Sequence, residues 1–344
     1  MALHRIAHIS ARLCSFATVL GALVAGPVAH AAPTYQLIDL GPNTTAVDIN
    51  HNGHVVGWYD RLGNKAGVWR QGAWHKTMRT NEVRPKGIGP QDLMAADLRT
   101  LDGFQTAGAV LPDGQVVDIQ AMLGADTSGY SEAVTADGTI VGIYYTIDGA
   151  YSFTYRDNVV TTLPCPAEYV SCMAHAASPS KGWIAGTAPR QNGDPWFIAA
   201  MLFDGTSWKD LGTLGGWVAD VYGVNRKGHV VGTSETRPNN HRTHAFIHTG
   251  KFMKDLKTLG GRNSYAYAIN SHGVVVGRSD VPDAEDSAFY WDGSGPMVDL
   301  NTLVPKPHGL HLVDAVAIND DGWIVGNATY WDTYHGYLLK PVSR

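Results

Sequence analysis

The segment Asp210–Phe246 reads DLGTLGGWVADVYGVNRKGHVVGTSETRPNNHRTHAF, and 45 residues later Asp255–Phe289 reads DLKTLGGRNSYAYAINSHGVVVGRSDVPDAEDSAF. Both segments place Thr-Leu-Gly-Gly, Asn-x-x-Gly and Ala-Phe in the same order at closely matched spacing. Many sequences satisfy one hydrophobic pattern, so near-identity at a fixed distance indicates that one structural unit has been copied. We therefore expect further copies elsewhere in the chain.

The most widely shared part of the repeat is an apolar residue followed by Asn-x-x-Gly and a short apolar stretch that ends in a second Gly. Four clear copies begin at Ile49, Val224, Ile269 and Ile318, and two weaker copies without the Asn begin at Val134 and Ala177. A gap of 85 residues, about twice the usual interval, separates Gly53 from Gly138. A seventh copy fits this gap at Gly87–Arg99 if Asp92 replaces the first Gly and Ala96 the second. Seven units of about 45 residues match the length of four-stranded propeller blades.

Each unit contains four short segments with the alternation of β-strands, and no stretch after the N-terminal segment shows a convincing helical period. The first such segment, YQLIDLG from Tyr35, resembles a fourth strand, whereas the last unit stops after its third strand, His335–Pro341. Pairing these two segments completes a blade and removes exposed sheet edges. The sequence therefore predicts an all-β, seven-bladed β-propeller over residues 32–344, closed by its N-terminal strand.

Residues 1–31 have the features of a secretory signal peptide. Arg5 and Arg12 lie in a start without acidic residues, the apolar run FATVLGALVAG follows, and Ala29–Ala31 supplies small residues for cleavage before Ala32. The apolar run is too short for a stable membrane anchor. We expect an exported protein, and retention in a periplasm fits this segment as well as release does.

The charge balance limits the classes of partner. The chain has 31 Asp+Glu against 26 Lys+Arg, which argues against nucleic acid or an anionic membrane surface. We expect a monomer that does not insert into membranes.

Two cysteines remain outside the N-terminal segment, Cys165 and Cys172, in CPAEYVSC. A close pair in an oxidising compartment is most simply a disulfide, which would stabilise the fold by roughly 2 to 3 kcal/mol. The alternative is a reactive or metal-binding pair, but no His or Cys stands beside it at zinc-like spacing.

The amino-acid sequence of the best copies resembles that of a known protein family. Thr243–Gly261, THAFIHTGKFMKDLKTLGG, followed by YAINSHGVVVG from Tyr267, resembles the HAF repeat, which is named for the His-Ala-Phe found here at His244–Phe246. The match is specific over residues 210–300 and weak over residues 79–196. The resemblance implies a bacterial extracellular protein of repeated β architecture and implies no established reaction.

Residues that recur in every unit are interpreted as structural. Asn and Gly satisfy a tight turn, and His244 and His335 occupy equivalent strand starts. His241 and His248 lie near His244, but no carboxylate joins them locally, so we predict no metal site there. Tryptophans that begin the second strand, such as Trp183, could stack on sugars, although packing between blades explains them more simply.

Function is expected where the copies differ. Connections from the second to the third strand, and from one unit to the next, are long and irregular, whereas the other turns are short. In a propeller the two long classes emerge on one face, here called the long-loop face, and variable loops usually carry binding residues. The predicted binding residues are Trp58, Arg84, Tyr130, Tyr222, Tyr265 and Tyr267. The expected ligand is a carbohydrate or a surface protein at the cell exterior.

The first strand of each blade lines the central channel, which gives a second hypothesis. Two places before the apolar anchor of the middle units stand Lys86, Glu132, His175, Tyr222 and Tyr267. Such a set could move protons on an acidic polysaccharide, as a lyase or hydrolase requires. Any solvated channel also has a polar lining, and a structural surface or matrix protein is a third interpretation. Whether the protein is an enzyme stays open.

No cofactor is expected from the motifs of the chain. The loop SDVPDAEDS does bring together hard oxygen ligands in Asp280, Asp283, Glu285 and Asp286. A Ca²⁺ site is therefore an alternative to the simpler interpretation of a solvated acidic loop.

Overall fold

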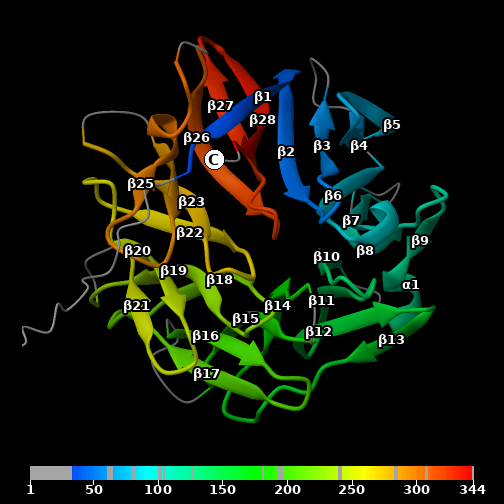
Figure 1. The fold of residues 1–344 in the computed structure, drawn as a ribbon. Coiled ribbons are helices and arrows are strands. Elements are labelled where there is room, and N and C mark those ends of the chain that lie inside the picture. The colour runs from blue at the N-terminus through cyan, green and yellow to red at the C-terminus, as the bar shows by residue number, and fades with distance from the viewer. Residues whose placement is uncertain are drawn as a thin grey trace, which may run out of the picture. The chain divides into compact units, whose positions relative to one another are not determined.

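The computed structural model describes residues 33–59, 65–79, 82–99, 103, 105–124, 128–179, 182–191, 197–238, 242–282, 286–306 and 309–342. The predicted signal peptide, His241, Asp283 and Glu285 lie outside these residues. Within them, seven four-stranded antiparallel sheets form the blades of a ring (Figure 1). This confirms the predicted seven-bladed β-propeller.

The first four blades follow the chain in order. Blade 1 contains β2 (Thr44–Ile49), β3 (Val55–Tyr59), β4 (Lys65–Arg70) and β5 (Ala73–Arg79). Blade 2 contains β6 (Val83–Ile88), β7 (Met94–Arg99), β8 (Gln105–Val110) and β9 (Val116–Asp118). Blade 3 contains β10 (Gly129–Val134), β11 (Ile140–Thr146), β12 (Gly149–Arg156) and β13 (Val159–Thr162). Blade 4 contains β14 (Met173–Ala177), β15 (Ile184–Pro189), β16 (Ile198–Phe203) and β17 (Trp208–Gly212).

The last three blades include the closing strand. Blade 5 contains β18 (Ala219–Val224), β19 (Val230–Glu235), β20 (Thr243–His248) and β21 (Met253–Asp255). Blade 6 contains β22 (Ser264–Ile269), β23 (Val275–Ser279), β24 (Ser287–Trp291) and β25 (Val298–Asp299). Blade 7 contains β26 (His311–Ile318), β27 (Ile324–Tyr330), β28 (Thr333–Pro341) and β1 (Tyr35–Pro42).

The ring closes as predicted, because β1 pairs antiparallel with β28. Tyr35 lies opposite Pro341, and Asp39 lies opposite Tyr337. The seventh copy is also confirmed, since β6 and β7 flank the turn in which Asp92 replaces Gly. Asp92 has a φ of 66°, the left-handed conformation that Gly supplies in the other copies.

Three short helices interrupt the strands within the described residues: α1 (Ile119–Leu123), and the 3-10 turns η1 (Pro90–Asp92) and η2 (Leu300–Thr302). α1 was not expected from the sequence, because five residues show no helical period. It is defined by its ends: the Asp118 side chain accepts a hydrogen bond from Ala121 N, and Gly124 ends the helix with a φ of 65°. None of the helices in the described part of the chain has the length and hydrophobicity of a membrane span.

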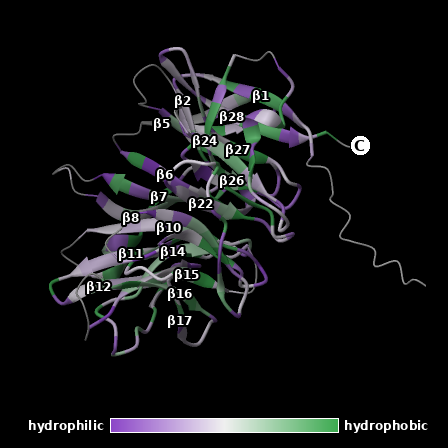
Figure 2. Ribbon diagram, turned by 90° about the vertical axis from the view of Figure 1, so that its left-hand side faces the viewer, coloured by the Kyte–Doolittle hydropathy of each residue, from purple (hydrophilic) through white to green (hydrophobic). Residues whose placement is uncertain are grey.

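The hydrophobic core lies between neighbouring blades. Figure 2 shows hydrophobic residues in strands across the molecule, and middle strands such as β4, β8 and β24 are buried along most of their length. Both faces of a sheet therefore pack on neighbouring blades. One cluster, for example, joins Val55 and Trp69 of blade 1 to Val325 and Leu338 of blade 7. The predicted disulfide between Cys165 and Cys172 is present in the connection from blade 3 to blade 4.

The Asn of the repeat does more than form its own turn. Its Oδ1 accepts hydrogen bonds from backbone amides two and four residues later, as Asn270 does from His272 N and Val274 N. Its Nδ2 crosses to the next blade, where Asn225 donates to Asn270 O and Asn270 to Asn319 O. Asn319 then donates to Asn50 O at 3.2 Å, which spans the closure of the ring. These buried amides therefore connect the blades along the short-turn side.

Candidate functional site

The first strand of every blade contains a β-bulge at the same place. At each bulge one residue has no partner in the neighbouring strand: Val47, Lys86, Glu132, His175, Tyr222, Tyr267 and Val316. We call these seven residues the inner ring. A bulge inserts an extra residue and re-aims its side chain. The fold therefore presents one side chain per blade at the centre of the propeller.

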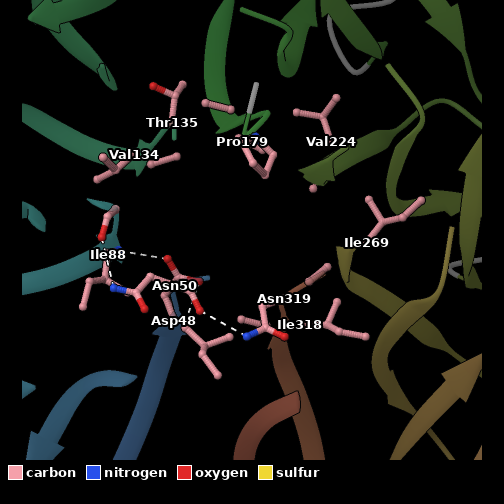
Figure 3. A pocket seen from close by; sticks show the side chains of 18 of the residues that line it. Asp48, Asn50, Ile88, Val134, Thr135, Pro179, Val224, Ile269, Ile318 and Asn319 are labelled. Atoms are coloured by element: carbon pink, nitrogen blue, oxygen red, sulfur yellow. Dashed lines mark hydrogen bonds between the residues drawn. The ribbon is translucent and has the colours of Figure 1, made fainter. Parts of the chain in front are cut away.

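The inner ring lines a central cavity of about 290 Å³. Its remaining walls come from the first strands and short turns, and include His51, Ala136, Pro179 and Asp320. Figure 3 shows Asp48, Ile88, Val134 and Ile318 around this cavity, with Asn319 bonded to Asn50. The cavity thus lies toward the short turns, on the side opposite the long-loop face.

One sector of the inner ring is charged. Lys86 Nζ lies 3.4 Å from Oδ2 of Asp97, a carboxylate that is almost fully buried. Burial raises the pKa of Glu132, and the positive charge of Lys86 opposes that shift. His175 Nε2 lies 3.0 Å from Thr187 Oγ1, and burial, aided by the charge of Lys86, lowers the pKa of His175 to about 4. His175 is therefore a neutral imidazole near pH 7.

The adjoining sector, on blades 5 and 6, is aromatic. The rings of Tyr222 and Tyr267 meet edge to face with centroids 5.5 Å apart, and Tyr265 stacks on Tyr267 at 6.3 Å. Arg278 lies over the Tyr265 ring at 5.0 Å. Burial raises the pKa of both Tyr222 and Tyr267, so these phenols stay protonated. Tyr222 is nevertheless 38 % exposed, which leaves an aromatic surface accessible within the channel.

All five predicted catalytic candidates therefore line one cavity. Among the described residues, however, no hydrogen bond joins any two of them; Lys86 is paired with Asp97, and His175 with Thr187. A general base must lie within hydrogen-bond reach of the proton it moves, and a tyrosine with a raised pKa is a poor base. These five side chains therefore share one cavity without forming a hydrogen-bonded network among themselves.

The predicted binding residues divide into two groups. Tyr222 and Tyr267 line the cavity, whereas Trp58, Arg84, Tyr130 and Tyr265 are not among its lining residues. Arg84 is exposed and Trp58 is half-buried. Tyr130 lies beside the charged sector, since Lys86 Nζ is 5.9 Å from the centre of its ring.

Sequence reasoning missed Asp48, whose carboxylate lines the same cavity. It accepts hydrogen bonds from Ile88 N at 2.9 Å and Ile49 N at 2.8 Å. Burial outweighs both bonds and raises the pKa of Asp48 to about 6. The available signal was an acidic residue directly after the inner-ring position, which no other copy has there.

The repeated histidines are structural, as predicted. His244 Nδ1 lies 3.0 Å from Asp255, and His335 Nδ1 lies 2.9 Å from Asp39 of the closing strand. Burial opposes ionisation of Asp255, but hydrogen bonds from His244 and Lys257 prevail and lower its pKa to about 2. In both blades the histidine thus contacts an aspartate of the fourth strand.

No group of three or more His, Cys, Asp and Glu side chains that could hold a metal ion occurs in the described part of the chain. Asp280 accepts hydrogen bonds from Asn263, and Asp286 pairs with Arg278 at 3.1 Å. Asp283 and Glu285 lie outside the described residues, so a Ca²⁺ site in this loop stays a prediction.

The lowered pKa of His175 makes stability depend on pH. Between about 4 and the ordinary value of 6.5, the unfolded chain binds a proton at this residue that the folded chain does not, so acidification across this range should destabilise the fold. A His175→Gln variant should lose less unfolding free energy than the natural chain over the same range. Comparing the two chains cancels the contribution of Asp48. An NMR titration with a His175 midpoint at or above 6.5 would contradict this assignment.

Comparisons with known proteins agree on the fold alone. No protein-family model and no curated protein sequence matches the chain. The β-propeller domain of the Trilobed protease from Pyrococcus furiosus is similar with a TM-score of 0.60 at 9% identity, covering 92% of this chain and 97% of that one. The Pyrococcus horikoshii acylaminoacyl peptidase is similar with a TM-score of 0.56 at 10% identity, over 85% of this chain but only 51% of its own length. The structure of YCF48 bound to D1 peptide is similar with a TM-score of 0.51 at 11% identity, covering 91% and 96% of the two chains.

Proposed function

We propose that this protein is an exported β-propeller of the HAF-repeat type that binds a carbohydrate, with one sugar unit entering the central cavity. The observation that carries this proposal is the inner ring. Seven equivalent bulges direct side chains into one cavity, and apart from two valines these side chains divide into a charged sector and an aromatic sector. The disulfide between Cys165 and Cys172 supports export, because such bonds persist in oxidising compartments.

A sugar ring matches the two sectors. It has apolar C–H faces that can pack on an aromatic ring, and hydroxyls that need hydrogen-bonding partners. The exposed part of Tyr222 offers the first kind of contact, and Lys86, Glu132 and neutral His175 offer donors and acceptors on the other side. A cavity of about 290 Å³ is at the lower end of small-molecule sites, which favours a single unit over a long segment.

Replacing Tyr222 or Tyr267 with Ala should weaken carbohydrate binding about tenfold or more, because aromatic anchors carry a large share of binding energy. A glycan array screened with the chain from Ala32 would identify the ligand, and calorimetry would measure the affinities. The matched control is Tyr334→Ala. Tyr334 is also aromatic, but its side chain is 67% exposed and lies on β28 of blade 7.

Unchanged melting temperatures would show that the variants remain folded. The proposal fails if Tyr334→Ala weakens binding as much as the two cavity variants do. It also fails if only peptides or proteins are bound, and their affinity is insensitive to Tyr222 and Tyr267.

A polysaccharide lyase or hydrolase is the second candidate, favoured by one observation. The cavity holds a neutral imidazole, His175, beside a carboxyl with a raised pKa, Glu132, and groups shifted in opposite directions commonly serve as base and acid. If this is the function, acidic polysaccharides should be cleaved by the natural chain and not by His175→Gln or Glu132→Gln. Absence of new chain ends at high protein concentration would leave binding as the function.

A further inference from the structure

Asp220 is a half-buried carboxylate beside the central cavity. It lies on β18, two residues before Tyr222 and therefore nearer the long-loop face. Within the described part of the chain, no group donates a hydrogen bond to this carboxylate and no cation pairs with it, and burial raises its pKa. A carboxylate removed from water is costly unless a donor or a cation compensates it. Asp220 is therefore open to a donor that a ligand supplies.

The equivalent residues of the next two blades are satisfied by the residue opposite them on the second strand. In blade 7, Asp314 lies opposite Asn327, which donates to it from its backbone N at 2.9 Å and from Nδ2 at 3.0 Å. In blade 6, Tyr265 lies opposite Arg278, whose guanidinium covers the tyrosine ring. The fold thus provides a place for a partner at this position of the strand pair.

Blade 5 uses that place differently. The residue opposite Asp220 is Thr233, which is 3% exposed. Its hydroxyl donates to the backbone oxygen of Ser264 in blade 6 at 2.9 Å. A hydroxyl has one proton to donate, so Thr233 cannot also donate to Asp220. The position that Asn327 compensates in blade 7 is therefore left uncompensated by the described residues of blade 5.

Tyr222 adds an aromatic surface beside this carboxylate. Burial raises the pKa of Tyr222, and the negative charge of Asp220 adds to that shift, since the two groups lie close together. The Tyr222 ring packs edge to face on Tyr267, yet it stays accessible within the channel. A carboxylate accepts charge-assisted hydrogen bonds from an ammonium group, and an aromatic face attracts the same cation. The pair is therefore suited to an organic ammonium.

The charges of the adjoining cavity also favour a cation. The lining contains three carboxylates, Asp48, Glu132 and Asp320, and one amine, Lys86. Three anions against one cation give a formal charge of −2, and Lys86 already lies 3.4 Å from Asp97. An anionic sugar would be repelled by these carboxylates, whereas a cationic sugar would be attracted.

We propose that the central cavity binds an amino sugar, whose ammonium group is held by Asp220 and Tyr222. This inference rests on the proposed function and narrows the carbohydrate to one with a free amino group. An ammonium group supplies three N–H donors, which the Asp220 carboxylate accepts. An N-acetylated amine is neutral and has a single N–H, so it would leave the charge of Asp220 uncompensated.

The test measures calorimetrically the affinity of the chain from Ala32 for glucosamine oligomers and for N-acetylglucosamine oligomers of the same length. At slightly acidic pH, where the free amines are charged, the glucosamine oligomers should bind about tenfold or more tightly than the acetylated ones. Asp220→Asn keeps the shape of the side chain and removes its charge. This variant should weaken glucosamine binding about tenfold or more and abolish the preference for the free amine.

The matched control is Asp292→Asn, which makes the same change of charge at an exposed turn of blade 6. It should alter the affinity by less than about twofold. Asp220→Asn should melt at or above the temperature of the natural chain, because it removes a half-buried charge that no described group compensates. A clearly lower melting temperature would show that the carboxylate has a structural role, and would overturn the proposal.

This inference and the proposed function fail in different ways. Equal affinities for both oligomers, lost in Tyr222→Ala but kept in Asp220→Asn, would overturn the amino-sugar assignment and leave the carbohydrate site intact. Equal losses in Asp220→Asn and Asp292→Asn would reduce the effect to net charge and overturn it as well. So would a failure of glucosamine oligomers to bind, whichever carbohydrate the array identifies.

Discussion

A chain that begins at Asn43, and so lacks β1, is expected not to fold into a stable ring. β1 is the fourth strand of blade 7, although it lies at the other end of the described sequence. Its side chains Tyr35 and Leu40 are only 2% and 5% exposed. Each would lose roughly 2 to 3 kcal/mol of burial, and the backbone bonds to β28 would be lost as well. The sum approaches the whole stability of an ordinary domain, about 5 to 15 kcal/mol.

Circular dichroism melting of this truncated chain, beside one that begins at Ala32, measures the effect. The longer chain should melt cooperatively and the shorter should not. A synthetic peptide of residues 33–42, added in excess, should restore cooperative melting, because it can occupy the free edge of β28. If the truncated chain alone melts within a few degrees of the longer one, closure by β1 is not what stabilises the propeller.

The number of blades could be predicted because the copies of the repeat recur at a nearly regular interval. Asp92 and Ala96 share no residue type with the glycines they replace, yet the 85-residue gap requires a copy there. Turn geometry then explains the substitution, since Asp92 adopts the left-handed conformation. Asp92 also accepts a hydrogen bond from Arg70, a contact that no residue pattern indicates.

The inner-ring positions were predicted to line the channel, but their separation from Arg84, Tyr130 and Tyr265 could not be predicted, because the bulges change the alternation of side chains. In a regular strand alternate residues lie on the same side, which would place Ile49, Val47 and Thr45 together. In the structure Ala46 pairs with Gly57 and Asp48 with Val56, so Val47 is an extra residue. Thr45 therefore shares a side with Asp48 and not with Ile49. The same shift in every blade separates the inner ring from the residues nearer the long-loop face.

The bulge also gives the second Gly of the repeat its role. In β23, a Cβ on Gly277 would clash with the backbone oxygen of Tyr265 and approach the ring of Phe289 at 2.8 Å. Gly57, Gly142, Gly186, Gly232 and Gly326 face the equivalent carbonyl oxygen in their own blades. None of these glycines needs a left-handed φ, so space and not backbone conformation requires the missing side chain.

Gly277→Ala should therefore lower the free energy of unfolding by about 3 kcal/mol, because the oxygen it meets belongs to a paired strand and cannot rotate away. For a chain of this size the melting temperature should fall by roughly 6 °C or more.

The matched control is Gly273→Asn, four residues earlier. Gly273 has a φ of 92° with nothing within 4 Å of an added Cβ, and Asn tolerates such backbone better than other residues do. Blade 2 carries Ala96 at the position of Gly277, fully buried, so a blade built around alanine exists within the same ring. If Gly277→Ala melts no lower than Gly273→Asn, blade 6 must relax as blade 2 has done, and the close approach is not what keeps this residue glycine.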